Sequence, residues 1–275
     1  MPSELSVALR ATAEAFLAAN PPPGEVLVCA ITGSHLYGFP SPDSDIDLKG
    51  IHQAPTAQVV SLFPGRSDHD RLAVFRGVEC DLTTNELAPA LRLLIKGNGN
   101  MLERIFSPLQ LVDTPALHEL RALATASLSK ASAGHYRGYL KGMRREYRKN
   151  PRAKSLLYCV RVALTGAHLL ENGVVEADLT ALAEPWGFPE ALELARFKVK
   201  NGEKVAPPAA LARSLEARLD ELDRLLTDAL SRSTLPDRPP NVDALDAWLV
   251  GRRRFGPIRC ASPVADAGRQ DQADC

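Results

Sequence analysis

The sequence predicts an α+β protein in which a small mixed sheet is followed by a helical region. Three short apolar runs that are bounded by turn residues indicate strands, at residues 25–32, 45–51 and 77–83. Beyond about residue 111, apolar residues recur at helical spacing and strand patterns are nearly absent. The expected organisation is a first domain at 1–110, a helical domain at 111–234, and a linker, short helix and disordered tail at 235–275.

Apolar periodicity and chain-breaking residues define the expected helices. The first helix is expected to begin after Ser3 as N-cap and to end at the proline-rich segment 20–24. Leucines at helical spacing within 209–231 favour packing against the body over a coiled coil, because they cover too few heptads. The other expected helices lie at 84–96, 128–149, 152–171 and around 244–251.

Composition narrows the class of protein. With 45% apolar and 24% charged residues, the 275-residue chain can bury a core, which excludes wholesale disorder. Its 33 basic and 33 acidic residues give no net charge, which excludes a globally basic nucleic-acid binder but not a local basic patch.

Apolar runs and cysteines in the sequence indicate where in the cell the protein is expected. No uncharged apolar run approaches the ~20 residues that span a bilayer, and Glu4, Arg10 and Glu14 interrupt any signal-peptide core. The five cysteines are odd in number and scattered, which is typical of a reducing compartment and offers no zinc site. We expect a soluble, cytoplasmic protein that makes no membrane contact.

The segment from Gly33 to Gly50 carries the strongest chemical pattern. It opens with Gly33-Ser34 and leads into a strand in which Asp45 and Asp47 share one face. Two carboxylates ~7 Å apart on one strand repel each other unless a divalent cation lies between them. Hard oxygen ligands with open positions suit Mg²⁺, which completes its shell with water and substrate phosphates.

Asp81, on a later strand, is the expected third carboxylate. Three aspartates can hold two metal ions at the attacking and leaving oxygens of a phosphoryl transfer, so we predict two Mg²⁺ ions, with Mn²⁺ able to substitute. Gly33 lets the backbone approach a phosphate, and Ser34 offers a hydroxyl and N–H donors. The other interpretation is a hairpin with merely solvated aspartates.

Other motifs that could use these residues fail on spacing. An EF-hand loop would need Gly at Leu48 and Glu at Ala54. Gly33-Ser34-His35 is not a nucleophile elbow, and no phosphate-binding loop of the Gly-x-x-x-x-Gly-Lys type is present.

These motifs resemble the polymerase-β nucleotidyltransferase superfamily. Gly-Ser, ten residues, Asp-x-Asp and a later third Asp are its pattern. The motifs Tyr37-Gly38, Ser44-Asp45 and Gly50 are similar to predicted bacterial nucleotidyltransferases that include an RNA-ligase-associated, RNA-repair group. The resemblance covers roughly residues 25–205, and the last 70 residues are unmatched.

The resemblance implies a polymerase-β-like catalytic domain and roles for its carboxylates. Asp45 and Asp47 would bind both metals, while Asp81 would complete the acceptor-side metal and help to deprotonate the attacking hydroxyl. Gly33 and Ser34 would hold the triphosphate. Glu79 shares the strand face of Asp81 and could replace it if the register differed, although the family pattern favours Asp81.

A strongly basic stretch follows at residues 130–161, with ten basic side chains against Glu146 alone. One stripe of it, predicted to contact nucleic acid, comprises Arg137, Lys141, Arg144 and Arg148. A merely solvated helix face is the equal alternative.

Lys154 and Arg161 share a face of the next helix, which the resemblance places over the nucleotide phosphates. Structural ion pairs explain these two residues nearly as well.

The expected activity is therefore Mg²⁺-dependent transfer of a nucleoside monophosphate from a nucleoside triphosphate to an acceptor hydroxyl, with release of pyrophosphate. The basic helix and the repair association favour an RNA end as acceptor. Two alternatives stay open: transfer to a protein or small-molecule hydroxyl, and a non-catalytic nucleotide- or RNA-binding partner.

Overall fold

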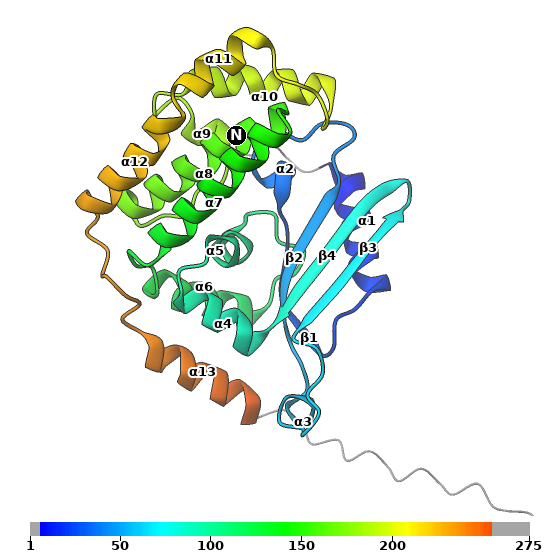
Figure 1. Cartoon of the computed structure of the whole chain (residues 1–275). Coiled ribbons are helices and arrows are strands. Elements are labelled where there is room, and N and C mark those ends of the chain that lie inside the picture. The colour runs from blue at the N-terminus through cyan, green and yellow to red at the C-terminus, as the bar shows by residue number, and fades with distance from the viewer. Residues whose placement is uncertain (1–5, 255–275) are drawn as a thin grey trace, which may run out of the picture.

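The computed structural model, which describes residues 6–254, contains one four-stranded mixed sheet (Figure 1). Its order is β1-β2-β4-β3; β2 and β4 run parallel, whereas the two outer pairs are antiparallel. The predicted α+β class with a small mixed sheet is confirmed. The strands are β1 (Glu25–Ile31), β2 (Ile46–Gln53), β3 (Asp68–Phe75) and β4 (Val78–Glu86).

Strand β3 was not predicted, because most of its side chains are exposed and its first four residues are all polar. The strand expected at 77–83 continues to Glu86. The helix expected at residue 84 consequently begins at Leu87, and the Glu86 carboxylate caps it by accepting a hydrogen bond from the Ala88 N–H.

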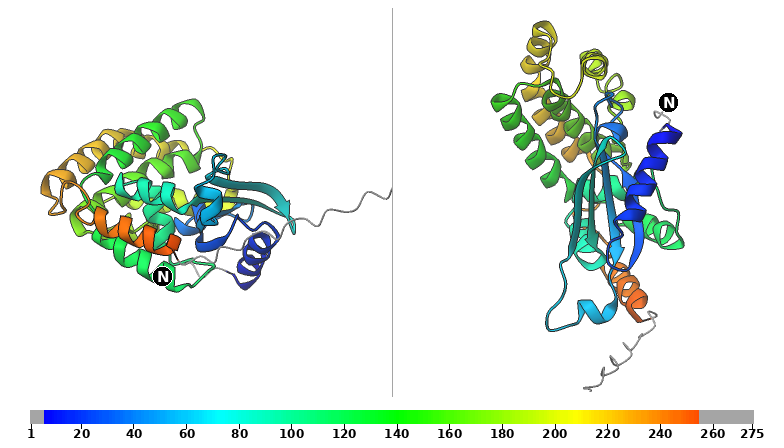
Figure 2. Two further views of the ribbon diagram at one scale, coloured as in Figure 1. Left: turned by 90° about the horizontal axis from the view of Figure 1, so that it is seen from below. Right: turned by 90° about the vertical axis from the view of Figure 1, so that its right-hand side faces the viewer.

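Helix α1 (Val7–Ala19) covers one face of the sheet (Figure 2). Its cap is Ser6, whose hydroxyl accepts from the Leu9 N–H; Ser3, the predicted cap, lies outside the described residues. Phe16 packs against buried side chains that alternate along β1, β2 and β4. These are Cys29, Ile31, Ile46, Leu48, Cys80 and Leu82.

The remaining helices gather beside the other face and the lower end of the sheet (Figures 1 and 2). Their core extends from Leu27 in β1 to Leu245 in α13, so it crosses the boundary expected near residue 110. The helices are α2 (Gly33–Leu36), α3 (Thr56–Val59), α4 (Leu87–Ile95), α5 (Gly99–Phe106), α6 (Pro115–Ala126), α7 (Ser132–Lys149), α8 (Ala153–Asn172), α9 (Leu179–Leu182), α10 (Pro189–Asn201), α11 (Ala209–Ala217), α12 (Leu219–Arg232) and α13 (Val242–Arg254).

The helices predicted within residues 6–254 are present, although those expected from 84 and 128 begin at Leu87 and Ser132 and one is divided. Helices α7 and α8 are separated near Pro151, and Gly173 closes α8 in the left-handed region at φ +65°. The helix expected over 209–231 is instead two helices that meet at Arg218. The tail expected to be disordered lies largely outside the described residues.

Leucines of α11 and α12 pack against the body of the protein, as the sequence favoured. Leu215, Leu222 and Leu226 are buried in the larger core, and α12 packs along α8. Among residues 6–254, no helix is long and apolar enough to cross a membrane. The three described cysteines, Cys29, Cys80 and Cys159, are free thiols and buried.

Truncating Leu226 tests this packing. Leu226 is fully buried, so Leu226→Ala should lower the free energy of unfolding by about 2–4 kcal/mol, measured by urea denaturation. Leu225→Ala, on the same helix but only partly buried, should cost clearly less. Equal losses, or midpoints that depend on protein concentration, would instead indicate that the leucines form an interface between chains.

Candidate functional site

Strand β2 presents charged side chains to the face of the sheet opposite α1. Ile46 and Leu48 are fully buried on the α1 side. Because strand side chains alternate, Asp45, Asp47 and Lys49 point to the other face. The alternation expected from the sequence is confirmed.

Strand β4 adds two more carboxylates to the same face. In the parallel register Asp47 lies opposite Asp81, and Ile46 lies opposite Cys80. Glu79 therefore extends towards Asp45, and both residues line one cavity. The sequence offered Asp81 and Glu79 as alternatives. In the structure Asp81 lies beside Asp47, and Glu79 lies near Asp45.

The backbone at Gly33 lies directly against the Asp47 carboxylate. Gly33 has φ +63°, and a Cβ there would lie 1.9 Å from Asp47 Oδ2, so only glycine fits. The Thr32 N–H donates to the Asp47 carbonyl at 2.8 Å. The Ser34 hydroxyl is buried and has no hydrogen-bond partner among residues 6–254.

The Asp45 and Asp47 carboxylates are under electrostatic strain. Burial, followed by repulsion from Asp45, raises the pKa of Asp47 to about 6. Asp45 Oδ1 is buried without a hydrogen-bond partner in the described part of the chain. Two hard oxygen donors that repel each other fit a Mg²⁺ ion, which would relieve this repulsion.

The third predicted ligand, Asp81, is held by the chain itself. Lys49 Nζ donates to Asp81 Oδ2 at 2.7 Å and to Thr83 Oγ1 at 3.1 Å. Within residues 6–254, no three His, Cys, Asp or Glu side chains are gathered closely enough to hold a metal ion. The structure therefore brings Asp45, Asp47 and Asp81 to one face without joining them into a closed metal site.

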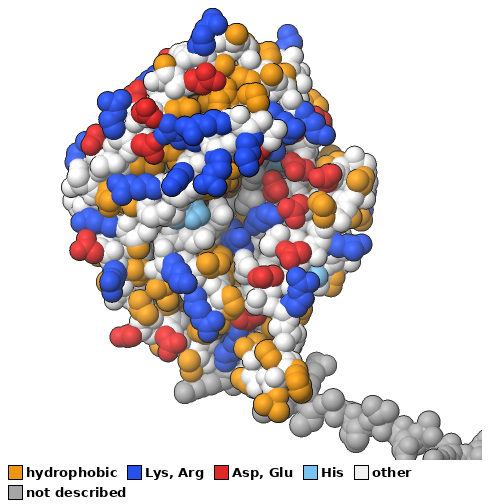
Figure 3. All heavy atoms as spheres, viewed as in Figure 1, with side chains coloured by type: hydrophobic (Ala, Val, Ile, Leu, Met, Phe, Trp, Pro, Cys, Tyr) orange, Lys and Arg blue, Asp and Glu red, His pale blue; other side chains and the backbone are white. Residues whose placement is uncertain are grey.

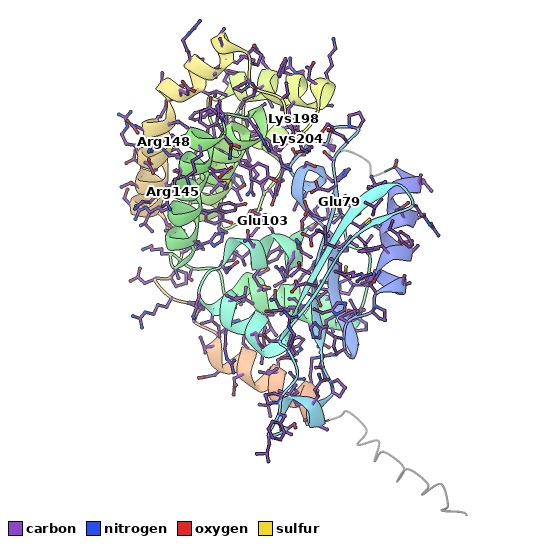
Figure 4. All side chains as sticks on the ribbon, turned by 45° about the vertical axis from the view of Figure 1, so that its right-hand side comes forward. Glu79, Glu103, Arg145, Arg148, Lys198 and Lys204 are labelled. Carbon is purple, nitrogen blue, oxygen red and sulfur yellow. The ribbon has the colours of Figure 1, made fainter. Side chains whose placement is uncertain are left out.

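Two cavities flank these carboxylates. The smaller, of about 220 Å³, reaches Asp47 and Lys49 and is walled by three tyrosines and Asn100. The larger, of about 410 Å³, joins Asp45 and Glu79 to basic side chains. Figure 4 shows Glu79 on β4, with Lys198 and Lys204 near the same end of the sheet. The tyrosines are Tyr37, Tyr139 and Tyr158; the basic side chains are Arg152, Lys154 and Lys204.

Lys154, predicted to bind phosphate, borders the larger cavity and is paired with Glu203 at 2.7 Å. Glu203 also pairs with Lys198, which is fully buried. Lys198 in turn donates to the Phe39 carbonyl at 3.0 Å and to the Ser41 and Ser44 hydroxyls. This Lys198–Glu203 cluster ties α10 to the loop that leads into Asp45.

Sequence reasoning missed the Lys198–Glu203 cluster. Its two charges lie five residues apart, beyond the pairing distance of one helical face. The other partners of Lys198 are more than 150 residues away in the chain. The sequence of the loop, Ser-Pro-Asp-Ser, indicated only a turn.

Arg161 does not reach a cavity. It is fully buried and bonds to Glu103 at 2.5 Å, with its guanidinium 3.9 Å from the centre of the Tyr37 ring. Glu103 also accepts from the Tyr37 hydroxyl at 2.8 Å. The structure thus favours the ion-pair alternative: Arg161 supports a wall of the smaller cavity instead of contacting phosphate.

Only part of the predicted basic stripe on α7 is exposed to solvent. Arg144 is 17% exposed and pairs with Asp220 at 2.6 Å and with Asp223. Arg137, Lys141 and Arg148 are exposed, although Arg137 also donates to Thr227. In Figure 3 basic side chains form a band over α7 that faces acidic side chains over the sheet across a hollow.

The exposed basic surface includes Lys141 and Arg148 of the predicted stripe and extends around the helix to Arg145. Arg145, which lies outside that stripe, is exposed, and Figure 4 shows it with Arg148 on α7. We call Lys141, Arg145 and Arg148 the α7 basic face.

Comparison with known proteins decides the family. The model of RlaP, the RNA repair pathway DNA polymerase beta family, matches residues 3–251. The chain belongs to this family. The match extends well beyond residue 205, where the resemblance seen in the sequence ended, and includes α11 and α12 and most of α13.

Similar proteins occur in both archaea and bacteria. The uncharacterized protein MJ0002 of Methanocaldococcus jannaschii is 26% identical over 229 residues, which cover 82% of this chain and 93% of that protein. The uncharacterized protein YcgL of Bacillus subtilis is 26% identical over 225 residues, covering 76% and 80%. A solved nucleotidyltransferase-like protein from Exiguobacterium sibiricum is more distant, with 13% identity, a TM-score of 0.32, and coverage of 80% and 75%.

The Lys198–Glu203 cluster predicts a specific acid sensitivity. Although burial opposes ionisation, Lys154, Lys198 and Ser44 hold the pKa of Glu203 at about 2, against an ordinary 4.5. A lowered pKa stabilises the fold above pH 4.5, and this stabilisation is lost as the pH falls towards 2. Glu203→Gln should therefore lower the free energy of unfolding at pH 7 by about 3 kcal/mol, measured by urea denaturation.

The gap between wild type and Glu203→Gln should shrink by more than half at pH 3. Glu193→Gln is the matched control, because Glu193 is exposed on the same helix as Lys198, and it should change stability by less than about 0.5 kcal/mol at either pH. A gap that does not depend on pH would show that packing, not charge, accounts for the loss.

Proposed function

We propose that this protein transfers a nucleoside monophosphate from a nucleoside triphosphate to an acceptor hydroxyl at an RNA end, with Mg²⁺, and releases pyrophosphate. One observation carries the proposal: the Asp47 carboxylate lies against the Gly33 backbone and opposite Asp81. Family membership supports the reaction class.

The two cavities support a division of the nucleotide between them. Lys154 and Arg152 beside Asp45 supply positive charge for a triphosphate. The unpartnered Ser34 hydroxyl can donate to a phosphate oxygen. The tyrosine-walled cavity, which reaches Asp47, offers aromatic surface for a nucleoside.

In the proposed reaction Asp45 and Asp47 would hold Mg²⁺ at the nucleotide, and Asp81 would face the acceptor. When bound, Mg²⁺ would neutralise the charge that develops on the phosphates. The acceptor oxygen attacks the α-phosphorus, the bond from that phosphorus to the bridging oxygen breaks, and pyrophosphate leaves. Asp81, opposite Asp47, accepts the proton of the attacking hydroxyl.

The RNA acceptor rests on charge. Lys141, Arg145 and Arg148 are exposed on one face of α7, and no salt bridge joins them to other described residues. Basic side chains without acidic partners attract a phosphodiester backbone. The band that they form lies across the hollow from the acidic side of the sheet (Figure 3).

Label transfer tests the reaction. Each of the four α-³²P-labelled ribonucleoside triphosphates is incubated with Mg²⁺, total RNA and the protein. Label should enter RNA with at least one nucleotide, and Asp45→Ala should reduce incorporation by more than about 100-fold, because it removes a metal-binding carboxylate. Glu193→Gln should leave incorporation unchanged.

The location of the label separates the alternatives. Label in a protein band or in a small molecule would show that this molecule, and not RNA, is the acceptor, and the reaction class would be unchanged. Nucleotide binding without any transfer, with Mn²⁺ as well as Mg²⁺, would overturn the catalytic proposal in favour of a binding partner.

Charge reversal on the α7 basic face tests the RNA part alone. The triple variant Lys141→Glu, Arg145→Glu, Arg148→Glu should weaken RNA binding at least tenfold, measured by filter binding. The slope of log K against log salt should fall by about 2, because each neutralised phosphate of a single strand adds about 0.7 to that slope. Nucleotide binding should not change.

Three exposed arginines on the C-terminal helices, Arg196, Arg213 and Arg224, provide the matched control. Reversing them changes the net charge by the same amount but should leave the salt slope intact. If both triple variants weaken RNA binding equally, only non-specific charge is involved and the α7 basic face is not the RNA surface.

A further inference from the structure

Lys49 occupies an unusual position in the candidate site. It follows Asp45 and Asp47 at every second residue of β2, so all three side chains share a face. Its ammonium could turn to Asp47 on its own strand, yet it bonds across the sheet to Asp81 and Thr83. A lysine thus lies within hydrogen-bond distance of the carboxylate that would bind the acceptor-side metal.

We propose that Lys49 is a built-in counter-ion of Asp81, which a divalent cation must displace before that carboxylate can bind metal. The inference rests on the proposed function, because it concerns the metal on the acceptor side. It explains why, among residues 6–254, the carboxylates share a face without forming a group of three that could hold a metal ion.

A purely structural role accounts poorly for this pair. The side chains of Lys49 and Asp81 are 23% and 37% exposed, and pairs that water reaches contribute little to stability. The same charge has a larger effect on a competing cation, because Lys49 Nζ lies only 2.7 Å from the Asp81 oxygen. The main effect of the Lys49 charge is therefore to weaken the binding of another cation to Asp81.

Lys49 also has a place to go when displaced. It lines the smaller cavity with Asp47 and the three tyrosines. An ammonium that leaves Asp81 can therefore turn towards a nucleotide in that cavity without crossing a buried surface. The two cation positions are consequently unequal: Asp45 and Asp47 bind first, and Asp81 becomes available only when Lys49 leaves it.

Binding of Mn²⁺ alone, followed by electron paramagnetic resonance, tests the inference without catalysis. Lys49→Met removes the charge while keeping the length of the side chain, and it should tighten the weaker class of Mn²⁺ sites about three- to tenfold. Lys49→Arg should restore the affinity of the wild type. Lys200→Met, which changes an exposed lysine on α10, should have no effect.

A double-mutant cycle assigns the effect to Asp81. Asp81→Asn should abolish the tightening, so that Lys49→Met and the wild type no longer differ in that background. Thr83→Val, which removes only the second acceptor of Lys49, should tighten Mn²⁺ binding by a smaller factor. Circular dichroism checks that each variant is folded.

Unchanged Mn²⁺ affinity in a folded Lys49→Met protein would overturn the inference. So would tightening that persists in Asp81→Asn, because Lys49 would then act on Asp45 or Asp47. The label-transfer experiment is independent of this cycle, so failure of the proposed reaction and failure of the Lys49 inference are distinguishable.

Discussion

The parallel pairing of β2 with β4 is the constraint on which the site depends. It places Asp47 opposite Asp81 and, on the other face, Ile46 opposite Cys80. Carboxylates collected on one face repel each other, so the register needs a compensating interaction. Burial of Ile46, Leu48, Cys80 and Leu82 against α1 supplies it. A slip of one residue would expose these side chains and bury the carboxylates, which makes the alternative register far less stable.

Buried charges, in addition to apolar packing, join the helical region to this face. The loop that enters Asp45 is held by buried Lys198 and by Glu203, and Glu203 also holds Lys154. A buried ion pair is costly to desolvate unless every polar atom finds a partner, and here the Phe39 carbonyl and two serine hydroxyls complete the set. The same residues therefore fix the entry to β2 and neutralise Lys154, which lines the same cavity as Asp45.

The parts of this arrangement that depend on local periodicity could be predicted from the sequence, and those that depend on distant partners could not. Alternation in β2 placed Asp45 and Asp47 on one face, and the resemblance identified the reaction class that family membership supports. Strand β3 was not predicted because an edge strand with a solvated face lacks apolar alternation. The sequence left Arg161 open between a phosphate ligand and a structural ion pair, because its partner Glu103 lies 58 residues earlier in the chain.

On α7, one residue of the predicted stripe, Arg144, is engaged in ion pairs, whereas the other three are exposed. The predicted stripe lies next to Tyr136, Leu140 and Tyr147, all of which are buried. A residue that flanks a buried stripe meets the neighbouring helix, so Arg144 turns to the acidic side chains of α12. Charges centred opposite the buried stripe have no such neighbour and remain free for a ligand. Arg145 follows Arg144 by one residue, about a quarter of a turn around the helix, and that rotation separates a side chain paired with α12 from one that is exposed.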